Sequence, residues 1–450
     1  MLGISGITAL QLAKQESSSV PVPSTSLSVQ FHYIAPQRPL RGFFIHAGVS
    51  KKSKQPHAPR TGAAATMQAM DSAARHTTAL SERIRAAAHD KTPLRIRGGG
   101  SKDFYGLKLQ GELLDTRTLS GIVSYEPSEL VVTVLAGTPL AELEAALAAQ
   151  GQCLAFEPPH FGAHSTVGGM VAAGLSGPSR ANVGAVRDFV LGLEMINGQG
   201  EVLRYGGQVM KNVAGYDVSR LMAGSWGTLG LITEVSLKVL PHPVAEATLR
   251  FADCNQQQAL QHLNHWGGQP LPLNASNWLQ EDAQSQGTLY LRLRGARAAV
   301  HAACLRLGGE LLNAETTAAD WRASRDLTLP WFTERTANHC LWRLSVPATA
   351  APLPLPADAT GPFIEWHGAQ RWVQAPRSAA ATLQQLAQSV GGSTSLFRAE
   401  SADQISGISD FDTYAQSSAA GRTSAQIHAR LKQAFDPSGI FNVGRLSANW

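Results

Sequence analysis

Short apolar runs separated by turns fill the chain between residues 93 and 243. The runs "LRIR", "VVTVLAG", "VLGLEMI", "EVLRYG" and "GLITEVSLKVL" predict strands of a sheet core. Between them, "LAELEAALAAQ" predicts a helix with Thr138 as its N-cap, Pro139 at its first position and Gly151 as its C-terminal stop. Strands mixed with helices and long glycine-rich loops predict an α+β domain.

The pattern changes after Pro243. Strand-like "EATLRFA", "GTLYLRLRG" and "NHCLWRLSV" alternate with helix-like "NQQQALQHLNHW" and "RAAVHAACLRLG". This alternation predicts a second, smaller α/β domain over residues 244–400, with a Pro- and Ala-rich loop at 347–362. "SAAATLQQLAQSV" and "SAQIHARLKQAF" predict further helices, and residues 401–450 end in the turn-rich "DPSGIFNVGRL".

Residues 1–66 lack sustained apolar periodicity and carry seven basic residues against the single acid Glu16, a net charge of +6. They are predicted to be a disordered extension. Either they form an organelle transit peptide or translation starts at Met67, and the second reading is favoured because an amphipathic helix begins there. The first folded domain then covers residues 67–243. Since the whole chain has a net charge of +5, residues 67–450 carry only −1, so a basic nucleic-acid footprint loses its support.

Composition also bears on membrane spans and on sites that depend on cysteine. No apolar stretch reaches the roughly 18 residues that a membrane span needs, so any membrane contact is expected to be peripheral or through a partner. The four cysteines lie far apart without a CxxC spacing, which argues against a metal centre, an iron-sulfur cluster or a disulfide framework. Reduced thiols in a cytoplasm fit this pattern best.

Three consecutive glycines, at 98–100 in "PLRIRGGGSKDFYG", follow the first predicted strand. Bare backbone of this kind can form an anion-binding nest for a diphosphate, or simply a tight turn in a sheet protein, and the motif alone leaves both open. Asp103 stands where a Rossmann fingerprint needs glycine, and no Gly-Lys-Ser/Thr ending of a P-loop is present. Phosphate binding here would therefore need another fold.

A second cluster of small residues, "GAHSTVGGMVAAGLSG" at 162–177, has room for a large flat ligand, and a third, "AGSWGTLG", leads into a strand. A histidine metal site and a serine nucleophile find little support in the sequence. His160 and His164 are predicted to lie on a loop among prolines and glycines, so they do not form a helical metal pair. No GxSxG nucleophile motif occurs.

Taken in order, the three clusters resemble the FAD-binding domain of the vanillyl-alcohol oxidase and p-cresol methylhydroxylase (PCMH) flavoprotein family, over about residues 90–243. The ending "FDPSGIFNVGRL" resembles the C-terminal segment of that family. Within it, the short cap domain, "KNVAGYDVSRLMAGSWGTLG" and "FIEWHGAQRW" are most similar to the small FAD-binding subunits of bacterial glycolate oxidases. The resemblance implies a PCMH-type two-subdomain FAD-binding domain, a smaller α/β cap domain and a C-terminal segment that returns to the flavin.

The resemblance also implies the cofactor-binding residues. By motif position they are Gly98, Gly99, Gly100 and Ser101 in a diphosphate loop, Thr166, Val167, Gly168 and Gly169 beside the flavin, Gly184 and Asp188 in a third block, Ile232 in a strand, and Asn442 and Arg445 in the C-terminal segment. Asp188 and Arg445 could equally form a structural ion pair. Family members with covalent FAD have a histidine where this chain has Ser101, so non-covalent FAD is expected.

The resemblance implies oxidation of glycolate or a related 2-hydroxy acid, with electrons passing through the flavin to an iron-sulfur subunit. It also implies a larger flavin subunit as a second partner. The alternative is a free-standing FAD-dependent D-lactate or alditol dehydrogenase or oxidase. The subunit is favoured because the cap region is small and shows no convergent acid-base set. By residue type alone, the candidates for substrate chemistry are His339, Arg343, Glu365, His367 and Arg371, and for each a structural role is the more expected one.

Overall fold

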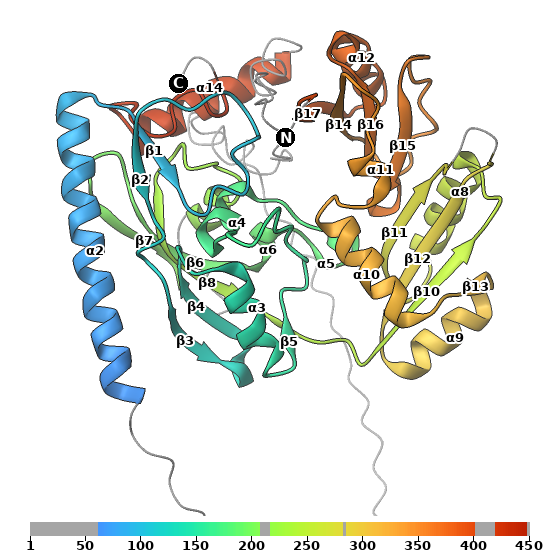
Figure 1. Ribbon diagram of the computed structural model, residues 1–450, viewed down its shortest axis with the longest axis horizontal. Helices are drawn as coiled ribbons and strands as arrows, with labels where there is room; N and C mark the ends of the chain where they lie inside the picture. Colours follow the sequence, from blue (N-terminus) through green and yellow to red (C-terminus); the bar gives the residue numbers. More distant parts are fainter. Residues whose placement is uncertain (1–61, 208–216, 282–284, 401–418, 448–450) are drawn as a thin grey trace, which may run out of the picture. The chain divides into compact units, whose positions relative to one another are not determined.

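The computed structural model describes residues 62–207, 217–281, 285–400 and 419–447. The predicted extension at 1–66 therefore lies almost entirely outside the described residues, as does most of "KNVAGYD". The helix predicted from Met67 is present as α2 (Gly62–Asp90), which begins before that methionine. The described chain forms an N-terminal domain, a cap domain and a C-terminal helix with a tail (Figure 1).

A five-stranded sheet is the centre of the N-terminal domain. Its order is β3 (Ile122–Glu126), β4 (Val131–Leu135), β8 (Leu231–Lys238), β6 (Val190–Ile196) and β7 (Val202–Gly206), and every pairing is antiparallel. The buried side chains of β4, β6 and β8 pack with four short helices in one apolar core. These helices are α3 (Leu140–Ala148), α4 (Val167–Ala173), α6 (Val186–Phe189) and α7 (Val218–Met222). The predicted strands of this region are confirmed.

The predicted N-cap of α3 is wrong. Pro139 occupies the N-cap position, and the hydroxyl of Thr138 instead accepts a hydrogen bond from the Gly121 N–H at 2.8 Å and donates to its carbonyl. The threonine thus ties the helix entry to the loop before β3. A long-range partner of this kind cannot be read from the local capping pattern.

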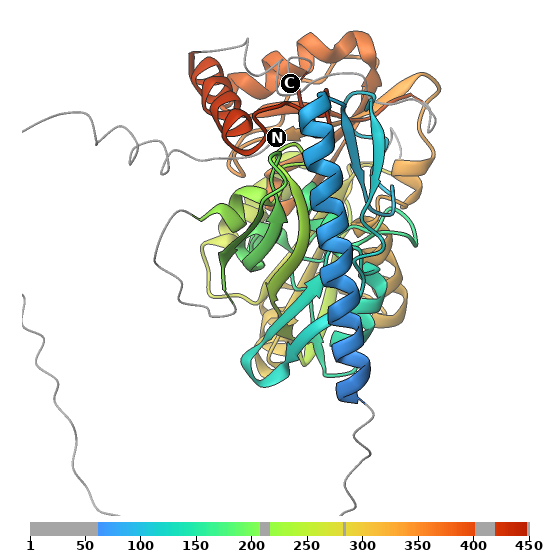
Figure 2. The ribbon, with the colours of Figure 1, turned by 90° about the vertical axis from the view of Figure 1, so that its left-hand side faces the viewer.

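The second part of this domain is a parallel pair of short strands, β1 (Leu94–Arg97) and β2 (Glu112–Asp115), beside α2 (Figures 1 and 2). Ile84 of α2, Leu94 and Leu114 are fully buried together with Phe441 from the C-terminal tail. Leu94 also forms an isolated bridge with Phe441. The tail therefore completes the core beneath the first glycine loop.

The cap domain contains one eight-stranded sheet, and all of its pairings are antiparallel. Its order is β13 (Glu310–Leu311), β10 (Ala245–Phe251), β12 (Thr288–Gly295), β11 (Leu273–Leu279), β15 (Thr360–Glu365), β16 (Gln370–Pro376), β14 (His339–Ser345) and β17 (Ser393–Arg398). Its helices are α8 (Gln256–Gly267), α9 (Arg297–Leu307), α10 (Ala314–Arg325), α11 (Pro330–Thr333) and α12 (Ala380–Ser389). The predicted alternation of strands and helices is present.

The cap has separate apolar cores at its two ends, one with α8 and α9 and the other with α12. The other face of β14, β16 and β17 carries Leu341, Trp372 and Phe397. These side chains pack in a third cluster that includes Tyr105 and Trp226 of the N-terminal domain. Strand β16 escaped prediction because six of its seven residues are buried, which leaves no polar alternation to detect.

After the cap, the chain returns through α14 (Ala419–Phe435). The buried ammonium of Lys432 donates to the carbonyls of Thr228 and Phe441 and to the Asp436 carboxylate, at 2.7–2.9 Å. Asp436 in turn accepts the backbone N–H of Ile440. This network fixes the tail against the N-terminal domain. Within the described residues, no helix combines the length and apolarity that crossing a bilayer requires.

Candidate cofactor-binding site

A cavity lies where the loop after β1, the start of α4 and the turn before β8 meet the C-terminal tail. These segments are far apart in sequence and are brought together by the fold. The lining residues come mainly from the glycine clusters: Gly98, Gly99, Gly100, Ser101, Lys102, Thr166, Gly168, Gly169, Ala172, Ala173, Trp226, Gly227, Gly230, Ile232, Asn442 and Arg445 are among them.

The loop at 99–102 offers the cavity a row of hydrogen-bond donors. Among the residues that the structure describes, no acceptor is paired with the backbone N–H of Gly99, Gly100, Ser101 or Lys102. Unpaired backbone donors in a partly buried loop are costly, and consecutive ones form an anion-binding nest. The anion reading of the triple glycine is therefore favoured over a simple turn.

Glycine is required in this loop because other backbone approaches it closely. A Cβ on Gly98 would lie 2.4 Å from the Thr166 hydroxyl, and one on Gly99 would lie 1.4 Å from the His164 carbonyl oxygen. Likewise, a Cβ on Gly168 would lie 2.6 Å from the Cβ of Ala136. The first two glycine clusters are thus in mutual contact, and the missing side chains let two backbone segments form one wall.

The tail closes the cavity through Asn442. Its Oδ1 accepts the Ile96 N–H at 2.8 Å, and its Nδ2 donates to the Trp226 carbonyl at 2.7 Å. Arg445 donates to the Lys102 carbonyl at 2.7 Å, and its guanidinium lies 5.1 Å from the Trp226 ring centre. The tail therefore joins the first and third glycine clusters.

Lys102 places a buried amino group at the cavity. Its Nζ lies 3.2 Å from the hydroxyls of Ser101 and Ser165, and burial lowers the pKa of Lys102 to about 8, although the charge of Asp326 opposes this shift. Both hydrogen-bond partners are neutral hydroxyls, so an anion in the cavity would stabilise the ammonium. The sequence analysis missed Lys102, and its position directly after the glycine loop was the available signal.

The predicted cofactor residues divide into two groups. Those that line the cavity are Gly98, Gly99, Gly100, Ser101, Thr166, Gly168, Gly169, Ile232, Asn442 and Arg445. Val167 does not line it, because its side chain is fully buried in the sheet core. Gly184 ends the short helix α5 (Arg180–Val183) with φ 100°, and Asp188 caps α6 by accepting the Ala185 N–H. These two residues shape the third block of the family motif away from the cavity wall.

Most candidates for substrate chemistry have structural partners in the cap. Glu365 accepts hydrogen bonds from Ser324, Gln370 and Trp372, and burial raises its pKa. The guanidinium of Arg371 donates to three carbonyls within the cap, among them that of Ala351 at 2.7 Å. Neither side chain lines the cavity.

The two histidines among these candidates differ in their surroundings. His367 lies 2.9 Å from the Ser276 hydroxyl, and burial lowers its pKa to about 4, so it is neutral near pH 7. His339 is half-buried, and its Nδ1 has no hydrogen-bond partner among the described residues. Neither lines the cavity, and Arg343, the fifth candidate, does not line it either.

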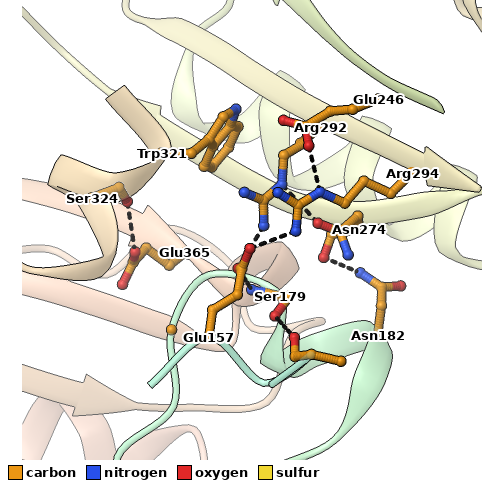
Figure 3. A network of polar contacts seen from close by, with 12 residues as sticks. Glu157, Ser179, Asn182, Glu246, Asn274, Arg292, Arg294, Trp321, Ser324 and Glu365 are labelled. Carbon is orange, nitrogen blue, oxygen red and sulfur yellow. Dashed lines mark hydrogen bonds and ion pairs between the residues drawn. The ribbon is translucent and has the colours of Figure 1, made fainter. Parts of the chain in front are cut away.

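The Glu157 carboxylate, whose side chain is 16% exposed, joins the two domains (Figure 3). Glu157, on the loop before α4, accepts from Arg292 at 2.6 Å and Arg294 at 2.5 Å, both on β12 of the cap. The Ser179 N–H also donates to it, at 3.2 Å. Arg292 is only 1% exposed, and its guanidinium lies 4.7 Å from the Trp321 ring centre. The carboxylate thus compensates two cap charges at the domain boundary.

Comparison with known proteins shows the family of the chain. A family model described as an FAD binding domain matches residues 71–206. Glycolate oxidase subunit GlcE of Escherichia coli is 42% identical over 373 residues, which cover 83% of this chain and 98% of that protein. Glycolate oxidase subunit GlcD of Bacillus subtilis is 32% identical over 39% of this chain and 38% of its own length.

Other matches have lower sequence identity or cover less of the chain. A D-lactate dehydrogenase of Anaerostipes hadrus is 34% identical over 31% of this chain and 29% of its own. A solved structure of alkyldihydroxyacetonephosphate synthase superposes with a TM-score of 0.54 over 81% of this chain and 73% of that one, at 15% identity, and so shows the fold alone. Near-complete coverage at 42% identity separates the first relative from these, and the chain belongs to the GlcE family of FAD-binding, PCMH-type flavoproteins.

Proposed function

We propose that this chain is the FAD-binding small subunit of a glycolate oxidase complex, which oxidises glycolate or a related 2-hydroxy acid. The observation that carries the proposal is the row of N–H donors at Gly99–Lys102, which have no acceptor among the described residues and lie beside a buried ammonium. This row fits the two negative charges of the FAD diphosphate. FAD supplies the hydride-accepting chemistry that protein side chains lack. The glycines at 168–169 and the Ala172–Ala173 wall leave room for a flat ring system.

Partner subunits are part of the proposal. The four cysteines of the chain stand far apart, and burial raises the pKa of each thiol, to about 12 for Cys340. Such thiols do not form a cluster-binding thiolate set, so electrons from the flavin need another acceptor. We assign that role to an iron-sulfur subunit, with a larger flavin subunit as the second partner, in a cytoplasmic complex that contacts a membrane only peripherally.

Reconstitution tests this assignment. The complete complex is expected to pass electrons from glycolate to an artificial acceptor, and omission of this subunit is expected to abolish the transfer. Activity that persists without this subunit would contradict the proposal. Anaerobic bleaching of the flavin of the isolated chain by D-lactate, without any response to glycolate, would instead support the free-standing dehydrogenase.

The bound FAD is expected to dissociate on denaturation. Ser101 has a hydroxyl where a covalent link of the family's histidine type needs an imidazole, and it lines the cavity. Acid precipitation of the yellow protein should leave all flavin absorbance in the supernatant. Flavin that remains in the washed pellet would show a covalent bond and contradict the expectation.

A further inference from the structure

A buried carboxylate lies in the middle of the cap sheet, beside helix α10. Glu365, the last residue of β15, lies opposite Asn277 of β11 and Gln370 of β16 in the strand register, so the three side chains share one face of the sheet. Ser324 of α10 reaches the same group, and its hydroxyl donates to Glu365 at 3.2 Å (Figure 3). Each of these four residues is at most 6% exposed, so the group is closed to water.

Only neutral donors surround this carboxylate. Gln370 and Trp372 donate to it at 2.8 and 2.7 Å, in addition to Ser324. Such a set of donors suits an ionised carboxylate, which has acceptor oxygens and no proton to give. Among the described residues, no positively charged side chain pairs with Glu365 or shifts its pKa. An ionised group in a closed interior is strongly unfavourable unless a charge of opposite sign accompanies it.

Two amide oxygens beside the carboxylate also lack partners. The Nδ2 of Asn277 donates to the Ser324 hydroxyl at 2.9 Å, and the Nε2 of Gln370 donates to Glu365. The Oδ1 of Asn277 and the Oε1 of Gln370 are buried without a hydrogen-bond donor in the part of the chain that the structure describes. Turning the Asn277 amide over would use the single proton of the Ser324 hydroxyl and take it from Glu365. The site therefore lacks positive charge and donors in either orientation.

The chemistry of these oxygens selects the class of ligand. Carboxylate, amide and hydroxyl oxygens are the ligands that hard cations prefer. With a single carboxylate, a monovalent ion balances the charge, whereas a divalent ion would leave a net positive charge in a closed space. A water molecule could donate to both amide oxygens, but it would leave the carboxylate uncompensated. The described residues hold no group of three or more His, Cys, Asp or Glu side chains suited to a metal ion, so a transition metal does not fit.

We propose that the carboxylate of Glu365 and the amide oxygens of Asn277 and Gln370 bind a sodium or potassium ion within the cap. The α10 hydroxyl beside them is a further ligand, so the ion joins three strands of the sheet to this helix. Asp326, which directly follows α10, accepts the His160 N–H at 2.8 Å. Fixing α10 therefore also supports its contact with the N-terminal domain. The ion site goes beyond the proposed function, since nothing in it depends on FAD.

Thermal unfolding in different chloride salts tests the ion site. The FAD-loaded chain is exchanged into tetramethylammonium chloride, whose cation is too large to enter, and is titrated with sodium or potassium chloride at constant ionic strength. The melting temperature is expected to rise by about 3 °C once the ion that fits reaches roughly 100 times its dissociation constant. Glu365→Gln, which removes the charge and keeps the shape, should abolish the rise. Glu315→Gln, at an exposed position on α10, is the matched control and should respond as the parent does.

Equal melting temperatures of the parent chain in all three salts would overturn the ion site, and so would a rise that Glu365→Gln retains. If Glu365→Gln does not fold, Asn277→Asp tests the same group of oxygens. A second carboxylate makes the site suitable for a divalent ion, so this variant should gain a stabilisation by calcium chloride that the parent lacks. Absence of that gain would likewise contradict the site.

Discussion

Replacing Glu157 with alanine is expected to lower the free energy of unfolding by about 3–5 kcal/mol, the cost of leaving a buried charge unpaired. The carboxylate is the shared partner of Arg292 and Arg294 across the domain boundary, and Arg292 is almost completely buried. Without it, the almost fully buried guanidinium of Arg292 loses its ion-pair partner, whereas Arg294 keeps the Glu246 carboxylate at 2.6 Å. Chemical denaturation followed by intrinsic fluorescence measures the loss.

Glu310→Ala is the matched control, because Glu310 forms an exposed ion pair with Arg250 at 3.0 Å on the same sheet. Exposed pairs contribute about 0–1 kcal/mol, so the control should lose little stability. Equal losses in the two variants would show that the buried network stabilises no more than a surface pair. The boundary would then depend on the aromatic cluster alone.

Protonation of the Glu157 carboxylate is expected to lower the stability of the protein at acidic pH. Burial by itself raises the pKa of Glu157, but Arg292 and Arg294 outweigh it and lower the pKa to about 2, below the ordinary value of 4.5. The stabilisation is therefore fully present above pH 4.5 and is lost as the pH falls toward 2. Between these values, the stability difference between the parent and Glu157→Ala should shrink.

Replacing Gly99 with alanine is expected to weaken FAD binding by roughly 100-fold or more, since loss of two hydrogen bonds to a charged diphosphate costs about 3 kcal/mol or more. The new Cβ would overlap the His164 carbonyl oxygen at 1.4 Å, and backbone oxygen cannot move aside as a flexible side chain can. The loop must therefore shift, which takes the N–H donors of the nest out of position. Equilibrium titration of the apoprotein with FAD measures the effect.

Gly267→Ala is the control, because a Cβ at this exposed position meets nothing within 4 Å. It should bind FAD as tightly as the parent chain. If Gly99→Ala also retained the parent affinity, the loop at 99–102 would not hold the diphosphate, and the assignment of the cavity would be wrong. A thermal melt of both apoproteins separates a misfolded variant from one that has lost only the ligand.

Much of the N-terminal domain was readable from the sequence because its strands are short apolar runs bounded by glycines. The cap was harder to predict. β16 is buried along nearly its whole length, and β11, "LNASNWL", mixes polar and apolar residues that are almost all buried, so neither shows the alternation typical of a half-exposed strand. Local capping rules also failed at Thr138, whose partner Gly121 is distant along the chain.

For the site, residue type and order identified the glycine loop and the tail, but not their partners. The motif included Val167 and Asp188, which the fold uses for a core contact and a helix cap. It omitted Lys102, whose position after the three glycines was the available signal, because only the structure shows that its amino group is buried at the cavity.

The sequence by itself determined the glycine clusters, the serine in place of histidine at 101 and the family to which these belong. Such features are local, and backbone freedom or the absence of an imidazole follows directly from residue type. Only the tertiary structure decided that the N–H groups of Gly99–Lys102 have no acceptor among the described residues and that Glu157 pairs with two cap arginines. These depend on distances between distant segments, and burial sets the strength of the charges involved.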